Sequence, residues 1–301
     1  MKIAASILSG VWALDPAEVS GLLPLAASVI SDPFRPVMSI ADRELECDAR
    51  ISASGVYVVS EYGEAAPPEN APEGSIAIIS LSGVVTKYDQ GSRGTAGTIT
   101  KNDLLARALA NPNITGVILL MDSPGGQAGA GERMVQTIRK ADKPVIGVID
   151  GMACSAMYEI AAACTEIYCV DQMSKAGSVG TFVTVADYSK QLEQMGIKLL
   201  ELYATDSTQK NIEVREALAG KPEKLQAYVD EINAIFLASV KESRGEKITD
   251  PDAYKGKAYT AKAAEAAGLI DGIATMDQVI GLMDSKISIS KSIQNQTTFL
   301  I

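Results

Sequence analysis

One serine stands in a segment whose residue types could support nucleophilic chemistry. Ser155 lies in "DGMACSAMYEI", residues 150–160, directly after the strand-like run "KPVIGVI". A serine attacks a carbonyl carbon only if a nearby base takes its proton, and the usual base is histidine. The chain contains no histidine. Ser155 is therefore either an ordinary helix-capping serine, which its residue type alone favours, or a nucleophile served by a different base.

A glycine-rich turn upstream of Ser155 could supply hydrogen-bond donors. It reads "MDSPGGQAGAG", residues 121–131, and follows the apolar run "GVILLM". Pro124 fixes one backbone angle, and Gly125 and Gly126 permit conformations that other residues resist, so backbone N–H groups can point into a cleft. Lys and Ser/Thr do not follow the glycines at the spacing of a Walker loop. Taken alone, the turn is equally well explained as a plain connection between a strand and a helix.

The elements that must position these two turns alternate between strands and helices. We expect strands at residues 76–81, 116–121, 144–149, 167–170, 181–185 and 198–203, and helices at 103–110, 129–140, 155–163 and 188–195. A long amphipathic helix over 221–245, a short helix over 260–268 and a last strand over 269–274 follow. This alternation predicts an α/β fold with mostly parallel strands and with function at their carboxyl ends.

The position of the two turns relative to each other favours catalysis over capping. Gly126 and Ser155 are 29 residues apart and follow neighbouring predicted strands. Both turns then lie at the same edge of the sheet, where one can supply oxyanion donors and the other a nucleophile.

Composition excludes several classes of function. The net charge is −10 and no cluster of Lys and Arg is present, which argues against a nucleic-acid partner. No uninterrupted apolar stretch reaches the roughly 20 residues of a membrane span, and the start "MKIAASILSGVWAL" matches a signal peptide only weakly. Four cysteines without CxxC spacing or histidine partners predict buried, reduced thiols rather than a zinc site; they are Cys47, Cys154, Cys164 and Cys169. We expect neither a metal nor a cofactor.

Four segments in order carry a family resemblance. They are "MDSPGG" (121–126), "DGMACSAMYEIAAAC" (150–164), "AGSVGTF" (176–182) and "AYTAKAAEAAGLIDGI" (258–273). Together they resemble the S49 peptidases, the group of signal peptide peptidase A and the phage capsid proteases, whose fold is shared with the Clp proteases and the crotonases. The start "VWALDP" also looks like that of phage or prophage members.

The resemblance sets expectations for architecture and setting. It implies a Clp protease/crotonase-like core of repeated ββα units with mostly parallel strands, an S49-type catalytic domain, over residues 71–284. Residues 1–70, which include the Pro/Glu/Ala-rich stretch, are then an N-terminal leader and linker, and the polar residues 285–301 a mobile tail. Phage members are cytoplasmic and process scaffold or capsid proteins. Proteins of this fold commonly form closed rings, so a homo-oligomer is expected.

The resemblance also implies a role for each site residue. Ser155 is the nucleophile, the backbone N–H groups of Gly126 and Ala156 form the oxyanion hole, and Ser178 orients a lysine that acts as the base. A lysine accepts a proton only when neutral, and its side chain ordinarily titrates near ~10.4, so the base must be desolvated. Cys154 is interpreted as a packing residue.

Four lysines downstream of Ser155 are candidates for the base. Lys190 lies on a polar helix face, and Lys198 begins a predicted strand from the opposite edge, so neither suits the cleft. Lys210 follows the predicted strand over 198–203, where small family members keep their lysine, and is preferred; Lys175, beside "AGSVG", is the alternative. A polar setting, "STQKN", also fits Lys210 as a solvated loop lysine.

The expected reaction is peptide-bond hydrolysis through an acyl-enzyme, with a peptide or unfolded protein bound as an added strand. The biological role expected from the resemblance is phage or prophage head maturation. Three alternatives stay open: a signal-peptide-degrading peptidase of the same family, an acyl-CoA hydratase or isomerase of the same superfold, and a catalytically inactive assembly protein. The hydratase would need carboxylates in the cleft, for which Glu159 and Glu132 are the nearest candidates.

Overall fold

A computed structural model describes residues 12–14, 56–59, 67–88, 95–198 and 200–298. Its centre is a sheet of eight described strands in the order β11-β10-β8-β6-β3-β2, with β9 and β12 attached beside β8. The strands of this path are β11 (Ala258–Thr260), β10 (Lys175–Gly177), β8 (Val145–Cys154), β6 (Ile114–Ser123), β3 (Ser75–Ser82) and β2 (Val56–Val59). β9 (Glu166–Cys169) and β12 (Gly272–Ile273) complete the sheet. All pairings except that of β10 with β11 are parallel, which confirms the predicted α/β fold.

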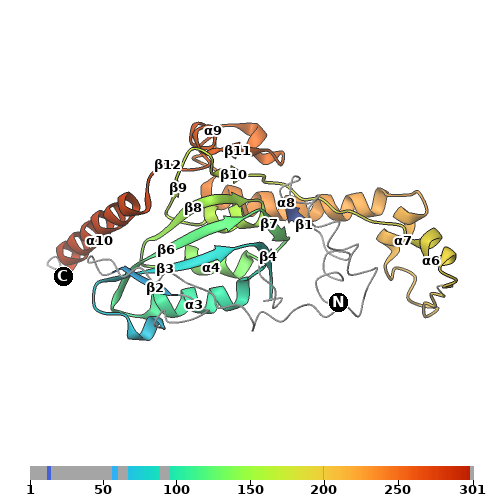
Figure 1. Cartoon of the computed structure of the whole chain (residues 1–301), viewed down its shortest axis with the longest axis horizontal. Coiled ribbons are helices and arrows are strands. Elements are labelled where there is room, and N and C mark those ends of the chain that lie inside the picture. The colour runs from blue at the N-terminus through green and yellow to red at the C-terminus, as the bar shows by residue number, and fades with distance from the viewer. Residues whose placement is uncertain (1–11, 15–55, 60–66, 89–94, 199, 299–301) are drawn as a thin grey trace.

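The three central strands form where the chain carries long apolar runs. Most residues of β3, β6 and β8 are buried, as expected for parallel strands covered on both faces. One face packs against α3 (Thr98–Ala110), α4 (Glu132–Arg139) and α5 (Ala156–Ala162), and the other against α10 (Met276–Thr298) (Figure 1).

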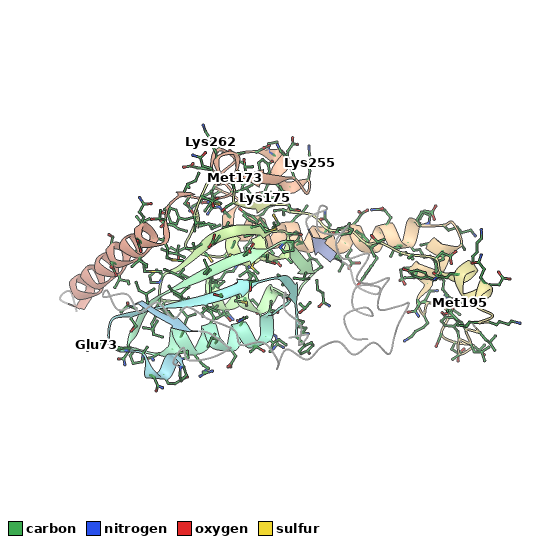
Figure 2. The ribbon with its side chains drawn as sticks, viewed as in Figure 1. Glu73, Met173, Lys175, Met195, Lys255 and Lys262 are labelled. Carbon is green, nitrogen blue, oxygen red and sulfur yellow. The ribbon has the colours of Figure 1, made fainter. Side chains whose placement is uncertain are left out.

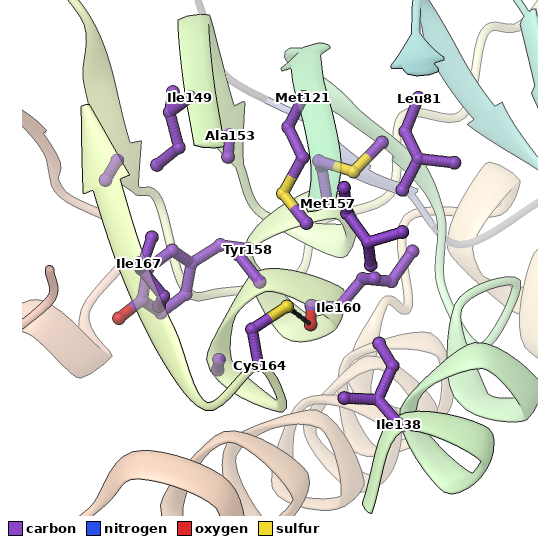
Figure 3. Close-up of a cluster of buried hydrophobic side chains, with 14 of the residues drawn as sticks. Leu81, Met121, Ile138, Ile149, Ala153, Met157, Tyr158, Ile160, Cys164 and Ile167 are labelled. Atoms are coloured by element: carbon purple, nitrogen blue, oxygen red, sulfur yellow. Dashed lines mark hydrogen bonds between the residues drawn. The ribbon is translucent and has the colours of Figure 1, made fainter. Parts of the chain in front are cut away.

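Helix α5, which follows β8 in the chain, packs tightly against the central sheet. Figure 3 shows Met157, Tyr158 and Ile160 of α5 packed against strand residues such as Met121 and Ile149. All five side chains are fully buried. α5 is therefore held rigidly against the sheet, and the residue that joins β8 to α5 has little freedom to move.

A second, smaller sheet lies beside the carboxyl ends of β6 and β8. Its order among the described strands is β1-β7-β4-β5, with bounds Trp12–Leu14, Gly125–Gln127, Val84–Thr86 and Thr95–Gly97. β7 is the centre of the glycine-rich turn identified in the sequence. The turn is therefore fixed by strand pairing on both of its edges.

The segment after β10 leaves the sheet, contrary to expectation. The predicted strands at 181–185 and 198–203 are wrong: the described residues of both segments form no strand. Instead the chain runs out to α6 (Ser189–Gln194) and α7 (Ile212–Leu218), and returns through α8 (Glu223–Arg244). Figure 1 shows α6 and α7 projecting beyond the sheet at the far end of α8. We call residues 189–218 the arm.

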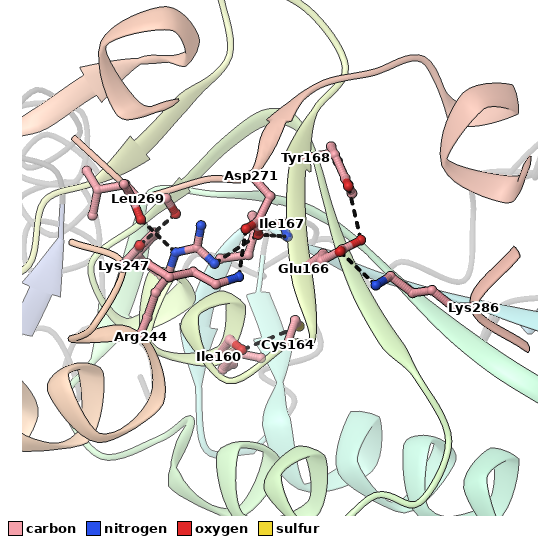
Figure 4. Close-up of polar contacts among 12 residues, drawn as sticks. Ile160, Cys164, Glu166, Ile167, Tyr168, Arg244, Lys247, Leu269, Asp271 and Lys286 are labelled. Carbon is pink, nitrogen blue, oxygen red and sulfur yellow. Dashed lines mark hydrogen bonds and ion pairs between the residues drawn. The ribbon is translucent and has the colours of Figure 1, made fainter. Parts of the chain in front are cut away.

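The other end of α8 is anchored by a buried ion pair. Arg244 donates to the Asp271 carboxylate at 2.9 Å and to the Gly268 carbonyl at 2.9 Å, while Lys247 donates to Asp271 at 2.7 Å (Figure 4). Asp271 also accepts the backbone N–H of Ile167 in β9 at 2.8 Å. Burial alone would raise the pKa of Asp271, but the hydrogen bonds from Arg244 and Lys247 outweigh it and lower that pKa below its ordinary value.

The remaining elements bear on the expected boundaries. β2 falls within the expected leader, yet it pairs with β3 in the central sheet. The short helices η2 (Pro68–Asn70), η3 (Pro251–Tyr254) and α9 (Ala261–Ala266) lie outside the sheet. α10 crosses the expected boundary at residue 284 and continues to Thr298. Within the described ranges no helix combines the length and apolar content needed to cross a membrane.

Three of the four cysteines are buried thiols. Cys154, Cys164 and Cys169 are enclosed in the core, and Cys47 lies outside the described residues. Burial raises the pKa of Cys164 and of Cys169 to about 12, so neither thiol ionises readily. The interpretation of these three residues as packing residues agrees with their surroundings.

Candidate active site

Ser155 joins β8 to α5 in a strained backbone conformation. Its φ is 56° and its ψ is −120°, a combination that L residues rarely adopt. The residue is completely buried, with 0% of its surface exposed. Strain at a non-glycine residue persists only where the surrounding structure enforces it, and such residues gather at functional sites.

The contacts of Ser155 decide between capping and another role for its hydroxyl. Although Ser155 stands immediately before α5, its side chain makes no capping hydrogen bond to that helix. Its Oγ lies 3.4 Å from the carbonyl oxygen of Gly180, and its backbone N–H donates to the Gly177 carbonyl at 2.7 Å. The structure therefore does not support the capping interpretation.

The glycine-rich turn lies at the same edge of the sheet as Ser155. β6 pairs with β8 up to the register of Ser123 with Ala153, and β7 packs against α5. Ser123 Oγ accepts the N–H of Gly125 at 3.1 Å, which shapes the turn. A Cβ atom at Gly126 would lie 1.9 Å from the carbonyl oxygen of Val85 in β4, so this position has no room for a side chain.

Ala156, the second residue expected to supply an oxyanion N–H group, directly follows Ser155. It is the first residue of α5, where backbone N–H groups have no partner within the helix, and it is buried. The two turns predicted to form one site are thus brought together by the pairing of β6 with β8.

Ser178 lies beside Ser155 on the neighbouring strand connection. It directly follows β10, and its N–H donates to the Lys257 carbonyl at 2.8 Å. Its φ of 53° is also in the left-handed region, and only 3% of its surface is exposed. Ser178 lies in the sequence between Gly177 and Gly180, whose carbonyls both contact Ser155, so the motif "AGSVG" forms one wall of the site.

The structure does not bring Lys210 to Ser155. Lys210 is exposed in the arm, between α6 and α7, where its N–H donates to the Ser207 carbonyl at 3.1 Å. Figure 1 shows both flanking helices well away from the end of β8.

Lys175, the alternative base, is nearer in the fold but also displaced along the sheet. It pairs with Met152 of β8, three residues before Ser155, which corresponds to roughly 10 Å along a strand. It is half-buried and lies close to Met173 (Figure 2). Its side chain would have to extend forward along β10, past Gly177, to contact the serine.

The carboxylates considered for hydratase chemistry lie elsewhere. Glu159 is buried on α5, and desolvation raises its pKa, opposed by a hydrogen bond with Ser239 of α8. The other charges that act on Glu159 are Glu132 and Arg139 of α4. The surroundings of Glu159 are thus the helical layer. In the described part of the chain, no group of three His, Cys, Asp or Glu side chains is placed to hold a metal ion.

Two features of the site carry no sequence signal. The carbonyl groups that face Ser155 belong to ordinary backbone, and only their position after β10 distinguishes them. The pairing of β1 with β7 joins segments that are far apart in the chain, so local pattern gives no indication of it.

Comparisons with known proteins find one family model and several curated relatives named as proteases. The model of peptidase family S49 matches residues 137–290, half of the chain. Capsid assembly protease C of Escherichia phage lambda is 26% identical over 222 residues, which cover 72% of this chain and 50% of that protein. A protein named Na(+)/H(+) antiporter NhaA from Brucella abortus (strain 2308) is 29% identical over 212 residues, 68% of this chain and 28% of that protein.

This chain matches only part of each of these two curated relatives, half of the relative's length or less. Among solved structures, a membrane protease from Pyrococcus horikoshii specific for a stomatin homologue aligns with a TM-score of 0.39 at 16% identity. That alignment covers 68% of this chain and 76% of that one.

Proposed function

Because this chain belongs to peptidase family S49, we propose that it is a serine endopeptidase in which Ser155 attacks the peptide carbonyl. The observation that carries this proposal is the state of Ser155 itself: strained, buried, not used as a cap, and adjacent to the glycine-rich turn. A serine held in this way is preorganised, so its Oγ needs little rearrangement to reach a carbonyl carbon.

The proposed reaction proceeds through an acyl-enzyme. A lysine takes the proton of Ser155 Oγ as the new C–O bond forms, and the carbonyl oxygen becomes an oxyanion between the N–H groups of Gly126 and Ala156. The lysine then gives the proton to the leaving amine, and water hydrolyses the ester. Ser178 is proposed to hold the lysine amine in place by a hydrogen bond.

Lys210 remains the proposed base, although it lies in the arm and does not contact Ser155 in this structure. The arm must approach a Ser155, either that of its own chain or that of a second copy in a homo-oligomer. Support for an oligomer comes from apolar side chains of the arm that are 41–85% exposed, namely Ile197, Leu200, Leu202, Val214 and Leu218. An apolar surface of this kind is typical of a protein interface.

The proposed substrates are extended or unfolded polypeptides. Relatives named as a capsid assembly protease and as a head-tail preconnector protein support a role in processing capsid or scaffold proteins of a phage or prophage. A cytoplasmic setting in the bacterial host is part of this proposal.

Casein hydrolysis between pH 6 and pH 10 tests the nucleophile and the base. Ser155→Ala and Lys210→Ala are each expected to reduce hydrolysis to background, whereas Lys190→Ala, an exposed lysine in the same arm, should keep wild-type activity. Wild-type activity in Ser155→Ala would refute the proposal. Background activity in Lys175→Ala together with full activity in Lys210→Ala would reassign the base.

Mixing the two inactive variants tests where the lysine comes from. If the arm serves a second copy, Ser155→Ala and Lys210→Ala chains should regain part of the activity when mixed, because one copy keeps the serine and the other the lysine. Activity that stays at background after mixing would mean that the arm serves its own chain.

A further inference from the structure

The strand nearest the start of the described chain occupies the free edge of the glycine-rich turn. β1 pairs antiparallel with β7, with Trp12 opposite Gln127, Ala13 opposite Gly126 and Leu14 opposite Gly125. Figure 1 shows β1 lying against β7 next to α8. A short segment from far upstream in the sequence thus lies against the proposed oxyanion residue.

This edge of β7 is the place where an added strand would bind. The opposite edge is covered by β4 through the pairing of Gly126 with Val85, and the closeness of that contact leaves no room for a second strand there. An uncovered strand edge offers N–H and C=O groups that bind extended peptides by backbone hydrogen bonding. Within the described chain, β1 is the strand that takes this position.

We infer that residues 12–14 are a built-in inhibitory strand, which holds the substrate position of the site until it is displaced. This inference rests on the proposed function, because the edge of β7 is a substrate position only if Gly126 serves the reaction of Ser155. β1 and a substrate strand need the same backbone groups of β7, so they exclude one another.

A double substitution removes the pairing without touching the site. Successive N–H groups of a strand point to opposite edges, so of two adjacent prolines one must delete a donor that faces β7. The test variant is therefore Ala13→Pro/Leu14→Pro. The matched control, Ala13→Val/Leu14→Ile, keeps both N–H groups and favours a strand.

Hydrogen exchange tests the docking of β1 independently of any activity. In chains that carry Ser155→Ala, the amides of Gly125–Gln127 that face β1 should exchange at least about tenfold faster with the two prolines than with the control. Equal exchange in the two variants would overturn the inference, whatever the outcome of the activity measurements.

Labelling of Ser155 by a fluorophosphonate probe tests inhibition. With Ser155 present, the proline variant should be labelled about tenfold faster than both the wild type and the control, the factor expected from the loss of one or two backbone hydrogen bonds. If the proline variant, the control and the wild type are all labelled at Ser155 at the same rate, the inference is overturned and the proposed function stands. If no variant is labelled at Ser155, the proposed function fails, and the inhibitory role fails with it.

Discussion

The backbone angles of Ser155 make a prediction that does not depend on enzyme activity. At a φ of 56° and a ψ of −120°, a residue with a Cβ atom is strained, whereas glycine is not. Ser155→Gly should therefore give a more stable protein than Ser155→Ala, although both variants lack the hydroxyl and both should be inactive. At most positions the order is reversed.

The size of the effect follows from two opposing contributions. Relief of a strained conformation is worth about 1–3 kcal/mol, and we take about 2 kcal/mol for this residue. Glycine makes the unfolded chain more flexible than alanine does, which costs about 0.4–1 kcal/mol. The difference in the free energy of unfolding should therefore be about 1 kcal/mol in favour of glycine. The weak contact of Oγ with the Gly180 carbonyl at 3.4 Å is lost in both variants and cancels.

Urea unfolding monitored by circular dichroism measures this difference. With an m-value of about 2–3 kcal/mol/M, the midpoint for Ser155→Gly should lie about 0.3–0.5 M above that for Ser155→Ala. Ala238 on the exposed side of α8 supplies the control, because Ala238→Gly should destabilise the protein by about 1 kcal/mol. If Ser155→Ala proves as stable as Ser155→Gly or more so, the strain at this position is not real.

Three further predictions concern charge and packing around the site. Asp271→Ala leaves the buried Arg244 without its carboxylate and should lower the free energy of unfolding by about 3–5 kcal/mol. Lys247→Ala removes a half-exposed side chain and should lower it by only about 0–1 kcal/mol. Equal losses of stability in urea unfolding would contradict the role of the buried pair. Burial raises the pKa of Glu159, so the folded state keeps that proton to higher pH than the unfolded state, and stability falls as pH rises from the ordinary value of 4.5 through the raised one. Glu159→Gln should therefore match the wild type in thermal unfolding below that window and exceed it above; a constant difference across pH would argue against a raised pKa. Gly126→Ala forces a Cβ atom into the backbone of β4 and should lower the rate of casein hydrolysis by more than about tenfold. A Gly126→Ala variant that hydrolyses casein at the wild-type rate would contradict this prediction.

The sheet could be predicted because its central strands are self-evident in sequence. β3, β6 and β8 are continuous apolar runs bounded by turn residues. Such runs can be predicted as buried strands without knowing which strands pair with them. Residues 181–185 and 198–203 are apolar in places as well, but a strand also needs a partner, and the described residues of these segments form no strand of either sheet. Local pattern cannot reveal the absence of a partner.

The same difference separates the parts of the site. Ser155 and Gly126 follow adjacent parallel strands, so their common edge could be inferred from spacing alone. The position of Lys210 depends on the path of some thirty residues after β10, for which the sequence offers no sheet pairing and hence no fixed geometry. β1 was not predicted for a related reason. Its pairing with β7 involves the backbone of only three residues, and their side-chain types do not indicate which strand they pair with.

The anchoring of α8 at one end makes the helix a lever. Its C-terminal residue, Arg244, is fixed to Asp271, whereas its N-terminal end carries α7 and the arm. Asn233, Phe236 and Val240 also hold the helix to the rest of the fold, which leaves the ten residues before Asn233, about 15 Å, as the part that can bend. A bend of about 11° near Asn233 displaces the N-terminal end by about 3 Å. That displacement equals the length of a hydrogen bond between a base and a hydroxyl. A bend confined to the N-terminal part of α8 leaves Phe236 and Val240 in the core and makes or breaks a contact at the tip of the arm.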